Sequence, residues 1–436
     1  MRDVKDNPSV AYYLLRWYSN TLIFHWFSTV EVSGKENIPQ DSPCVILPCH
    51  QNGLMDCLTL LVVFKKPITF FAKSSLFVST IVSNFLTFLR IMPAYRQQEG
   101  IQNVSKNEDN FLKAIDLLLR DYPFCIMPEG GQNEKRNLRP FAKGAFRIAF
   151  YAQEKLQENK AIYLIPIGLD YGHYDKIGYP FTLNIAKPIN VLSYMSAYRE
   201  NPAKALNMLK EEAYQSLSST MLDIRSETYY DVIYMAAYVY NFQMLTALNL
   251  KDNHSNRLKA RQVIAKQLDE IAVQTPEKLQ ILAEKCSIWR KKDPDFVTIA
   301  NSYPKQKFVF ILPYILFLFP VFVYGFLLNA LTILTIGILT PRYKNSGFTA
   351  TIKYTLFVLL LPVNHLLVAV LVAVMTSSWL IPLVIFLTGM PFTVLCKQYV
   401  SKLRILKNKL LLHKHTKYIL DICLEMEGLK QQFFSH

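Results

Sequence analysis

The order of apolar and polar positions divides the chain into two kinds of sequence. Over roughly residues 29 to 190, short apolar runs without a helical period alternate with segments in which apolar residues recur at helical spacing. Runs of the first kind predict buried strands, and segments of the second kind predict helices. Strands that alternate with helices favour an α/β fold, in which helices pack on the faces of a sheet.

Six strands and four helices are predicted in this part of the chain. The predicted strands are Thr29 to Val32, Cys44 to Pro48, Ile68 to Ala72, Arg90 to Arg96, Phe124 to Met127 and Ile162 to Leu169. The predicted helices are Asp56 to Phe64, Ser75 to Leu89, residues 105 to 120 and Ala142 to Gln157. Ligands of open α/β sheets bind where strands end in loops. Functional side chains are therefore expected in the loops that follow these strands.

Two long uncharged runs predict membrane segments near the C-terminus. Phe308 to Thr340 is almost uncharged, and Thr355 to Cys396 is long enough for two spans of about twenty residues. Basic residues flank both runs, and their preference for the cytoplasmic side favours hairpins. Pro313, Pro320 and Gly325 permit a tight or re-entrant hairpin in the first run, and a single kinked span is the alternative. We expect transmembrane helical hairpins in both runs, at about 308–340 and 355–396.

The remaining segments predict helices of other kinds. Val10 to Phe27 is rich in aromatic residues and predicts an interfacial helix on the bilayer, although an ordinary packed helix fits the same pattern. Mixed-charge helical sequence follows the α/β part and carries no recognisable chemistry. The predicted organisation is an interfacial helix at 1–28, an α/β domain at 29–200, a helical accessory region at 201–305, a membrane domain at 306–398 and a basic helix at 399–436.

Charge and composition limit the classes of molecule that the chain is expected to bind. The net charge is +15, from 48 Lys and Arg against 33 Asp and Glu, in a chain that is 51% hydrophobic. This balance suits an anionic membrane surface or phosphorylated ligands. Nucleic acid also attracts basic chains, but the sequence has no zinc module or aromatic RNA-binding signature. We therefore expect membrane lipids as partners and no nucleic acid.

The seven cysteines are scattered through the chain without the spacing of a zinc module or a secreted disulfide framework. This distribution indicates reduced thiols in the cytoplasm. Cys44, Cys49, His50 and Cys57 lie close together in the sequence, but no second pair of ligands follows them. We therefore expect no metal site.

The candidate chemistry begins directly after the strand Cys44 to Pro48. Cys49 to Asp56 reads Cys-His-Gln-Asn-Gly-Leu-Met-Asp, so that His50 lies at the end of a strand and Asp56 at the start of a helix. The two side chains face each other across this turn. A histidine oriented by a carboxylate can act as a general base. On its own, the pair also fits an ordinary surface turn.

Three further blocks give the pair a context. Residues 90–96 read Arg-Ile-Met-Pro-Ala-Tyr-Arg, residues 128–131 read Pro-Glu-Gly-Gly, and residues 165–168 read Ile-Pro-Ile-Gly. In this order and spacing, the four blocks resemble those of the PlsC-type glycerolipid acyltransferases, over about residues 29 to 190. The resemblance implies a PlsC-like domain with a central mixed sheet flanked by helices.

The resemblance also implies roles for individual residues. His50 would be the general base and Asp56 would orient its ring, without a serine nucleophile. Substrate would be bound by residues of the motif blocks and by nearby cations, namely Asn52, Lys73, Arg96, Glu129, Gly130, Gly131, Lys135 and Arg136. A solvated surface charge is the alternative for each lysine and for Arg136. No cofactor is implied, and the acyl donor would be acyl-CoA or acyl carrier protein.

The spacing of the first block leaves the acceptor open. Five residues, Gln51 to Met55, separate His50 from Asp56, where the commonest family pattern has four. This spacing and Pro-Glu-Gly-Gly resemble the fungal glycerol-3-phosphate and dihydroxyacetone-phosphate acyltransferases. We expect lysophosphatidic acid as the acceptor, giving phosphatidic acid, with glycerol 3-phosphate or dihydroxyacetone phosphate as the alternative. A non-catalytic lipid-binding scaffold is the rival from another class. The expected location is a bacterial plasma membrane, with the catalytic domain on its cytoplasmic face.

Overall fold

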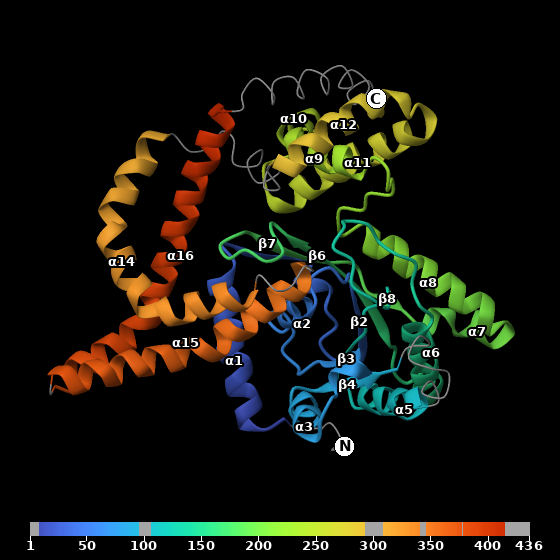
Figure 1. Ribbon diagram of the computed structural model, residues 1–436. Helices are drawn as coiled ribbons and strands as arrows, with labels where there is room; N and C mark the ends of the chain where they lie inside the picture. Colours follow the sequence, from blue (N-terminus) through green and yellow to red (C-terminus); the bar gives the residue numbers. More distant parts are fainter. Residues whose placement is uncertain (1–7, 96–105, 293–307, 341–345, 377, 415–436) are drawn as a thin grey trace. The chain divides into compact units, whose positions relative to one another are not determined.

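The chain forms two compact units in the computed structural model, which describes residues 8–95, 106–292, 308–340, 346–376 and 378–414 (Figure 1). Unit 1 comprises Met1–Phe24, Val30–Asp170 and Thr182–Met221. Unit 2 comprises His25–Thr29, Tyr171–Phe181 and Leu222–His436.

An eight-stranded sheet organises unit 1. Its strands are β1 (Val30–Ser33), β2 (Cys44–Pro48), β3 (Thr69–Lys73), β4 (Ile91–Ala94), β5 (Phe124–Cys125), β6 (Tyr163–Tyr171), β7 (Phe181–Ile185) and β8 (Ile189–Asn190). Their order is β1-β7-β6-β2-β5-β3-β4, and β8 pairs with β6. Parallel pairs join β2 to β5 and β6, and β3 to β4 and β5, whereas β8 is antiparallel to β6. The predicted α/β class with a mixed sheet is confirmed.

The central strand β2 shows why a continuous apolar run predicts a buried strand. All five residues of Cys44–Pro48 are buried, and Val45, Ile46 and Leu47 are completely inaccessible to solvent. A parallel strand covered on both faces reads as a continuous apolar run, which is the pattern of this segment. Strands β7 and β8 were not predicted. Strand β7 buries the polar Thr182 and Asn184, and Asn184 Nδ2 donates to the carbonyl of Thr220 at 3.1 Å.

Seven α-helices of the described residues belong to the same part of the fold as this sheet. They are α1 (Val10–Trp26), α2 (Leu54–Leu60), α3 (Thr80–Phe88), α5 (Lys106–Leu119), α6 (Gly144–Leu156), α7 (Met195–Glu200) and α8 (Pro202–Ser218), and only the last residues of α1 belong to unit 2. The predicted helix over Ser75 to Leu89 begins later, at Thr80, because the Ser79 side chain caps it by accepting from the Val82 N–H.

Helices α1 and α3 share an exposed apolar surface. The rings of Tyr12 on α1 and Phe88 on α3 are in contact, with centroids 6.3 Å apart. Large apolar side chains of both helices nevertheless face solvent, namely Val10, Tyr13, Leu14 and Trp17 on α1 and Ile81 and Phe85 on α3. Exposed apolar patches of this kind are typical of surfaces that meet a membrane or a partner. The interfacial role of α1 stays a prediction.

Four helices form the first part of unit 2. They are α9 (Tyr230–Val239), α10 (Asn241–Ala247), α11 (His254–Gln274) and α12 (Glu277–Lys292). Tyr230, Tyr238 and Tyr240 are buried in the core that these helices share. The guanidinium of Arg261 lies 4.6 Å from the ring centroid of Tyr238.

Three long helices follow in the described part of unit 2. They are α14 (Phe308–Leu339), α15 (Ser346–Thr376) and α16 (Leu380–Lys414). The segments Ile311–Leu339, Phe348–Thr376 and Leu380–Arg404 within them are long and apolar enough to cross a membrane. Helices α15 and α16 pack against each other, as the predicted hairpin at 355–396 requires.

The predicted hairpin at 308–340 is wrong, because Phe308–Leu339 is one helix of 32 residues. Pro313 and Pro320 lie inside this helix, and proline is tolerated in membrane helices where neighbours satisfy the freed backbone groups. Gly325 lies against α16 rather than in a turn. A Cβ atom there would lie 2.5 Å from the Sγ atom of Cys396. The glycine therefore permits close helix packing, which is a common use of small residues in membranes.

Substitution of Gly168 tests the packing of β6. A Cβ atom at this position would lie 2.2 Å from the carbonyl oxygen of Thr220, and backbone atoms cannot move aside as a flexible side chain can. Gly168→Ala is therefore expected to lower the free energy of unfolding by about 1–3 kcal/mol through overpacking. The measurement is the Tm of the purified full-length protein in detergent. Gly337→Ala is the matched control, since no described heavy atom lies within 4 Å of its Cβ position. Equal Tm values for the two variants would contradict this packing.

Candidate active site

The parallel pairing of the central strands collects the candidate residues at one edge of the sheet. His50 follows β2, Glu129 follows β5, and Asp170 lies near the end of β6. Strand β2 pairs in parallel with both β5 and β6. The carboxyl ends of parallel neighbours meet at the same edge, where α/β proteins bind their ligands.

His50 and Asp56 form a direct pair. The Nδ1 atom of His50 lies 2.9 Å from Oδ2 of Asp56. The Asp56 side chain is completely buried, whereas 18% of the His50 side chain is exposed. The same Oδ2 atom accepts the backbone N–H groups of Gln51 at 3.0 Å and Asn52 at 2.9 Å. Asp56 therefore both orients the imidazole and fixes the backbone of the turn.

The turn between them has a glycine where the backbone requires one. Gly53 has φ 55° and ψ −126°, a conformation that is accessible to glycine and unfavourable for other residues. It precedes α2, whose first turn contains Asp56. This turn brings the backbone N–H groups of Gln51 and Asn52 to the carboxylate, across the five residues that separate the pair.

Glu129 connects the Pro-Glu-Gly-Gly loop to the His50 loop. Its Oε1 atom accepts the backbone N–H of His50 at 3.0 Å, and its Oε2 atom accepts the backbone N–H of Arg139 at 3.2 Å. Burial raises the pKa of Glu129, and the hydrogen bonds from His50 and Arg139 oppose this shift. The backbone N–H of Asn133 donates to the carbonyl of His50 at 2.9 Å. These hydrogen bonds join the Glu129 side chain and its loop to the backbone of His50.

Arg136 is buried and forms an ion pair with Asp170. Arg136 was predicted to be a substrate-binding cation, and Asp170 was not among the predicted site residues. The signal for Asp170 was its place directly after the predicted strand Ile162 to Leu169. Arg139 was not predicted either, and no sequence pattern marks it. Its backbone N–H donates to Glu129, and its guanidinium donates to the carbonyl of Gly131.

The other predicted substrate-binding residues have varied environments, and their roles stay predictions. Asn52 is completely buried beside Asp56, and its backbone N–H donates to that carboxylate. Lys73, at the end of β3, and Lys135 are exposed. Gly130 and Gly131 belong to the Glu129 loop, and Gly130 has φ 66°. Arg96 lies outside the described residues.

Cys49 precedes His50 but has the environment of a structural thiol. It is completely buried, and its Sγ atom accepts the backbone N–H of Leu169 at 3.2 Å. Burial raises the pKa of Cys49 well above its usual range, and the Asp56 carboxylate adds to this shift. The thiolate is the nucleophilic form of cysteine, so this residue is unsuited to nucleophilic attack.

Within the described residues, no group of three or more His, Cys, Asp or Glu side chains is placed to hold a metal ion.

A comparison with models of protein families found a match in the α/β part of the chain. The model of a family described as Acyltransferase matches residues 29–170. This part of the chain is similar to the acyltransferases that the family contains. The matched residues extend from just before β1 to Asp170, and they include His50, Asp56 and Glu129. The geometry described above therefore lies within the part of the chain that matches this family.

Two individual proteins are similar to parts of the chain. The 1-acyl-sn-glycerol-3-phosphate acyltransferase of Borreliella burgdorferi is 29% identical over 126 residues, which are 28% of this chain and 48% of that protein. The chain thus spans about half the length of this curated relative. The crystal structure of the 1-acyl-sn-glycerophosphate (LPA) acyltransferase PlsC from Thermotoga maritima matches with a TM-score of 0.33 at 19% identity, covering 47% of this chain and 78% of that one.

Substitution of Glu129 tests whether this side chain positions the His50 loop. Glu129→Ala removes the acceptor of two backbone N–H groups, and it is expected to lower the free energy of unfolding by roughly 1–3 kcal/mol. Hydrogen exchange in residues 50–56 should become faster at the same time. Glu129→Gln retains one acceptor oxygen and should lose less stability.

The control for this experiment is Glu158→Ala at an exposed position. Hydrogen exchange followed by mass spectrometry measures the loop, and thermal unfolding measures the whole protein. Unchanged exchange of residues 50–56 in Glu129→Ala would exclude the positioning role.

Proposed function

We propose that the chain is a membrane-bound enzyme that transfers a fatty acyl group from a thioester donor, acyl-CoA or acyl carrier protein, to lysophosphatidic acid. The product would be phosphatidic acid. The observation that carries the proposal is the His50–Asp56 pair within the part of the chain that matches the Acyltransferase family. The name of the relative from Borreliella burgdorferi, a 1-acyl-sn-glycerol-3-phosphate acyltransferase, agrees with this acceptor. The domain would work on the cytoplasmic side of a bacterial plasma membrane.

The geometry of the pair supports general base catalysis by His50. Asp56 is buried as an acceptor, so Nδ1 of His50 carries the hydrogen that points to it. The Nε2 atom then has the lone pair, and it can take the proton of the acceptor hydroxyl as the oxygen attacks the thioester carbonyl. The Asp56 carboxylate stabilises the imidazolium that forms, as the aspartate of a hydrolase triad does.

The remaining step needs no covalent acyl-enzyme. The tetrahedral intermediate collapses, the carbon–sulfur bond breaks, and the thiolate leaves. The imidazolium of His50 returns its proton to that sulfur, so the products are the ester and the free thiol of the donor. No serine nucleophile is required, and Cys49 is buried as a thiol.

The exposed apolar surface of α1 and α3 favours a lipid acceptor over a soluble one. Val10, Leu14 and Trp17 on α1 and Ile81 and Phe85 on α3 are each more than half exposed. A surface of this kind can rest on a bilayer, from which an acceptor with one acyl chain can enter. Cations such as Lys73, Lys135 and Arg96 would bind the acceptor's phosphate.

One observation favours a second candidate function. The five residues between His50 and Asp56 resemble the spacing of the fungal glycerol-3-phosphate and dihydroxyacetone-phosphate acyltransferases. In that case the acceptor would be glycerol 3-phosphate or dihydroxyacetone phosphate. The third candidate is a non-catalytic lipid-binding scaffold. It does not explain why a buried carboxylate orients His50.

The acceptor is tested with the purified full-length protein in detergent and an acyl-CoA donor. We expect acyl transfer to lysophosphatidic acid in preference to glycerol 3-phosphate and dihydroxyacetone phosphate, measured as labelled lipid product. Faster transfer to either soluble acceptor would establish the second candidate function. Transfer to none of the three would contradict the proposal.

The role of His50 is tested by substitution in the same assay. His50→Ala is expected to reduce the rate by about 10²–10⁴-fold, because the general base is lost. His254→Ala, at the start of α11 and outside the site, is the control and should retain the wild-type rate. A His50→Ala variant as active as this control would exclude His50 as the general base.

A further inference from the structure

Helix α2 carries Asp56 in its first turn but has only seven residues, Leu54–Leu60. A helix this short is not stable by itself, so contacts with the rest of the chain must hold it in place. Met55 and Leu60 are completely buried and anchor one side of the helix in the core. The C-terminal end needs further partners, because the last carbonyl groups of a helix have no donors within it.

The segment that follows α2 provides some of these donors itself. Backbone N–H groups of residues 61–64 donate to the carbonyls of residues 58–60. Val63 and Phe64 are buried, so this turn is packed against the domain. The carbonyls of residues 61 and 64–66 receive their donors from another helix, α1.

Arg16 of α1 supplies those donors. Its Nη2 atom donates to the carbonyl of Leu61 at 2.9 Å and to the carbonyl of Phe64. Its Nη1 atom donates to the carbonyls of Lys65 at 3.3 Å and Lys66 at 3.4 Å. A cation is also favoured at this end of a helix, where the helix dipole is negative. One guanidinium thus gathers four carbonyls at the end of α2.

Asn20, one turn further along α1, adds another hydrogen bond. Its Nδ2 atom donates to the same carbonyl of Leu61 at 3.2 Å. Tyr12, Arg16 and Asn20 recur every four residues and therefore lie on one face of the helix. Tyr12 is buried, and Arg16 and Asn20 are partly buried. This face of α1 packs on the α/β domain, and all of these contacts lie within unit 1.

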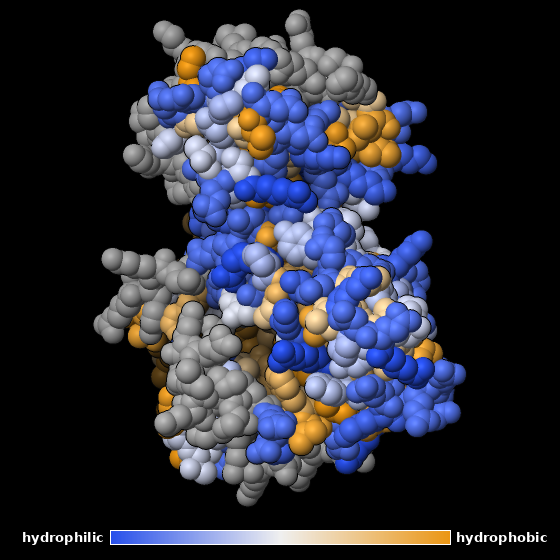
Figure 2. Space-filling view, turned by 90° about the vertical axis from the view of Figure 1, so that its right-hand side faces the viewer, coloured by the Kyte–Doolittle hydropathy of each residue, from blue (hydrophilic) through white to orange (hydrophobic). Residues whose placement is uncertain are grey.

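Another face of α1 is apolar and exposed. Val10, Leu14 and Trp17 on this face are each more than half exposed. Hydrophilic residues prevail, by contrast, on the face of the molecule that Figure 2 shows. The helix whose apolar surface suits contact with a bilayer is therefore also the helix that holds the end of α2.

We propose that Arg16 is a positioning residue for the His50–Asp56 pair, so that α1 serves catalysis as well as membrane contact. Arg16 holds the C-terminal end of α2, and the helix then keeps Asp56 where its carboxylate reaches Nδ1 of His50. Arg16 acts through α2 and touches none of the reacting atoms. The inference rests on the acyl transfer proposed for this chain.

The test compares Arg16→Gln with the wild-type protein, each purified at full length in detergent, in acyl transfer from acyl-CoA to lysophosphatidic acid. We expect kcat to fall by about tenfold, because a small displacement of a catalytic group is costly. KM for lysophosphatidic acid should stay within about twofold of wild type, because the binding of the acceptor is unchanged. If α1 served membrane contact alone, KM would rise and kcat would not change. That result would overturn the proposal.

Hydrogen exchange followed by mass spectrometry gives a second readout that does not need activity. The amides of residues 54–61 should exchange faster in Arg16→Gln, because the end of α2 opens more often. Unchanged exchange in this segment would overturn the role of Arg16. A wild-type protein that transfers no acyl group would overturn the proposed function instead, so the two failures are distinguishable.

Two further variants separate positioning from a general loss of stability. Arg16→Lys keeps the positive charge and up to three N–H donors, and it should recover part of the rate that Arg16→Gln loses. Asn20→Ala removes only one donor to Leu61 and should lower kcat by a smaller factor. The second variant keeps the test decisive if Arg16→Gln does not fold.

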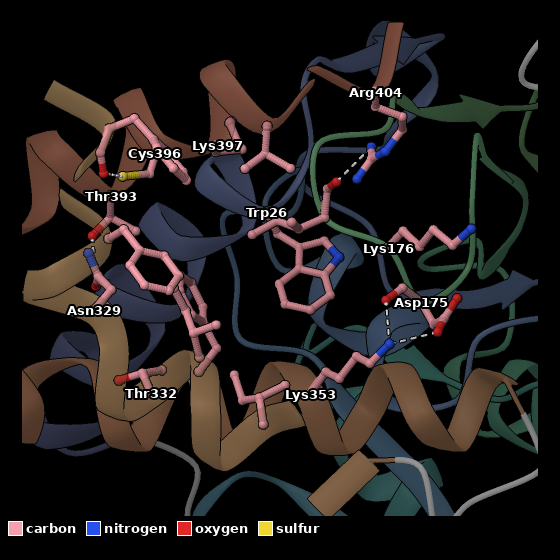
Figure 3. Close-up of a pocket in the computed structure, with 17 residues that line it drawn as sticks. Trp26, Asp175, Lys176, Asn329, Thr332, Lys353, Thr393, Cys396, Lys397 and Arg404 are labelled. Atoms are coloured by element: carbon pink, nitrogen blue, oxygen red, sulfur yellow. Dashed lines mark hydrogen bonds and ion pairs between the residues drawn. The ribbon is translucent and has the colours of Figure 1, made fainter. Parts of the chain in front are cut away.

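Lys353→Gln is the matched control. Like Arg16, Lys353 is partly buried and donates to a backbone carbonyl, that of Asp175 at 3.2 Å. Figure 3 shows these contacts, which include an ion pair of 2.7 Å with the Asp175 carboxylate and lie in unit 2. This variant should keep the wild-type kcat and the wild-type exchange of residues 54–61. A tenfold loss of kcat in the control as well would overturn the specific role of Arg16.

Discussion

The buried carboxylate of Asp56 determines the local structure on which the site depends. One of its oxygen atoms accepts two backbone N–H groups and the Nδ1 hydrogen of His50. A buried carboxylate is costly unless it is hydrogen-bonded or paired, and here two backbone N–H groups of the turn and His50 provide such bonds. The same contacts that stabilise the carboxylate therefore fix the position and the tautomer of His50. The hydrogen bonds of Asp56 thus account both for the shape of the turn and for the orientation of His50.

The site also requires that segments far apart in the sequence lie close together, and the sheet achieves this. Glu129 and Asp170 are far from His50 in the sequence, but their strands flank β2 in parallel register. Glu129 then contacts the backbone of His50 directly, and Asp170 pairs with Arg136 from the loop after β5. The ion pair is buried, so removing one partner would leave an uncompensated charge. These contacts make the loops around His50 a connected structure rather than separate turns.

The central part of this fold was predictable because its pattern is simple. Strand β2 is a short apolar run, and the His50–Asp56 spacing places the two side chains across one turn. Strand β8 has only two residues, too few for a pattern, whereas β7 was missed although Phe181–Ile185 alternates apolar and polar residues as a strand does. The burial of Thr182 and Asn184 in β7 depends on contacts with distant segments such as Thr220. The hairpin at 308–340 was wrong because Gly325 and the prolines suggested a turn, whereas Gly325 serves close packing of α14 on α16. Arg139 was missed since its contact with Glu129 exists only in the folded chain. Local patterns thus predict elements and short-range pairs, and tertiary contacts decide the rest.

The central claim is that the charge of Asp56 supports His50 as a general base, and the most direct test is the rate of acyl transfer by Asp56→Asn. Asparagine has nearly the same shape and can still accept the N–H groups of Gln51 and Asn52, so Tm should remain close to that of the wild-type protein. The rate should fall by about 10²–10⁴-fold, because the imidazolium loses its counter-charge and the ring its preferred tautomer. A folded Asp56→Asn variant with a rate within about twofold of wild type would contradict this account.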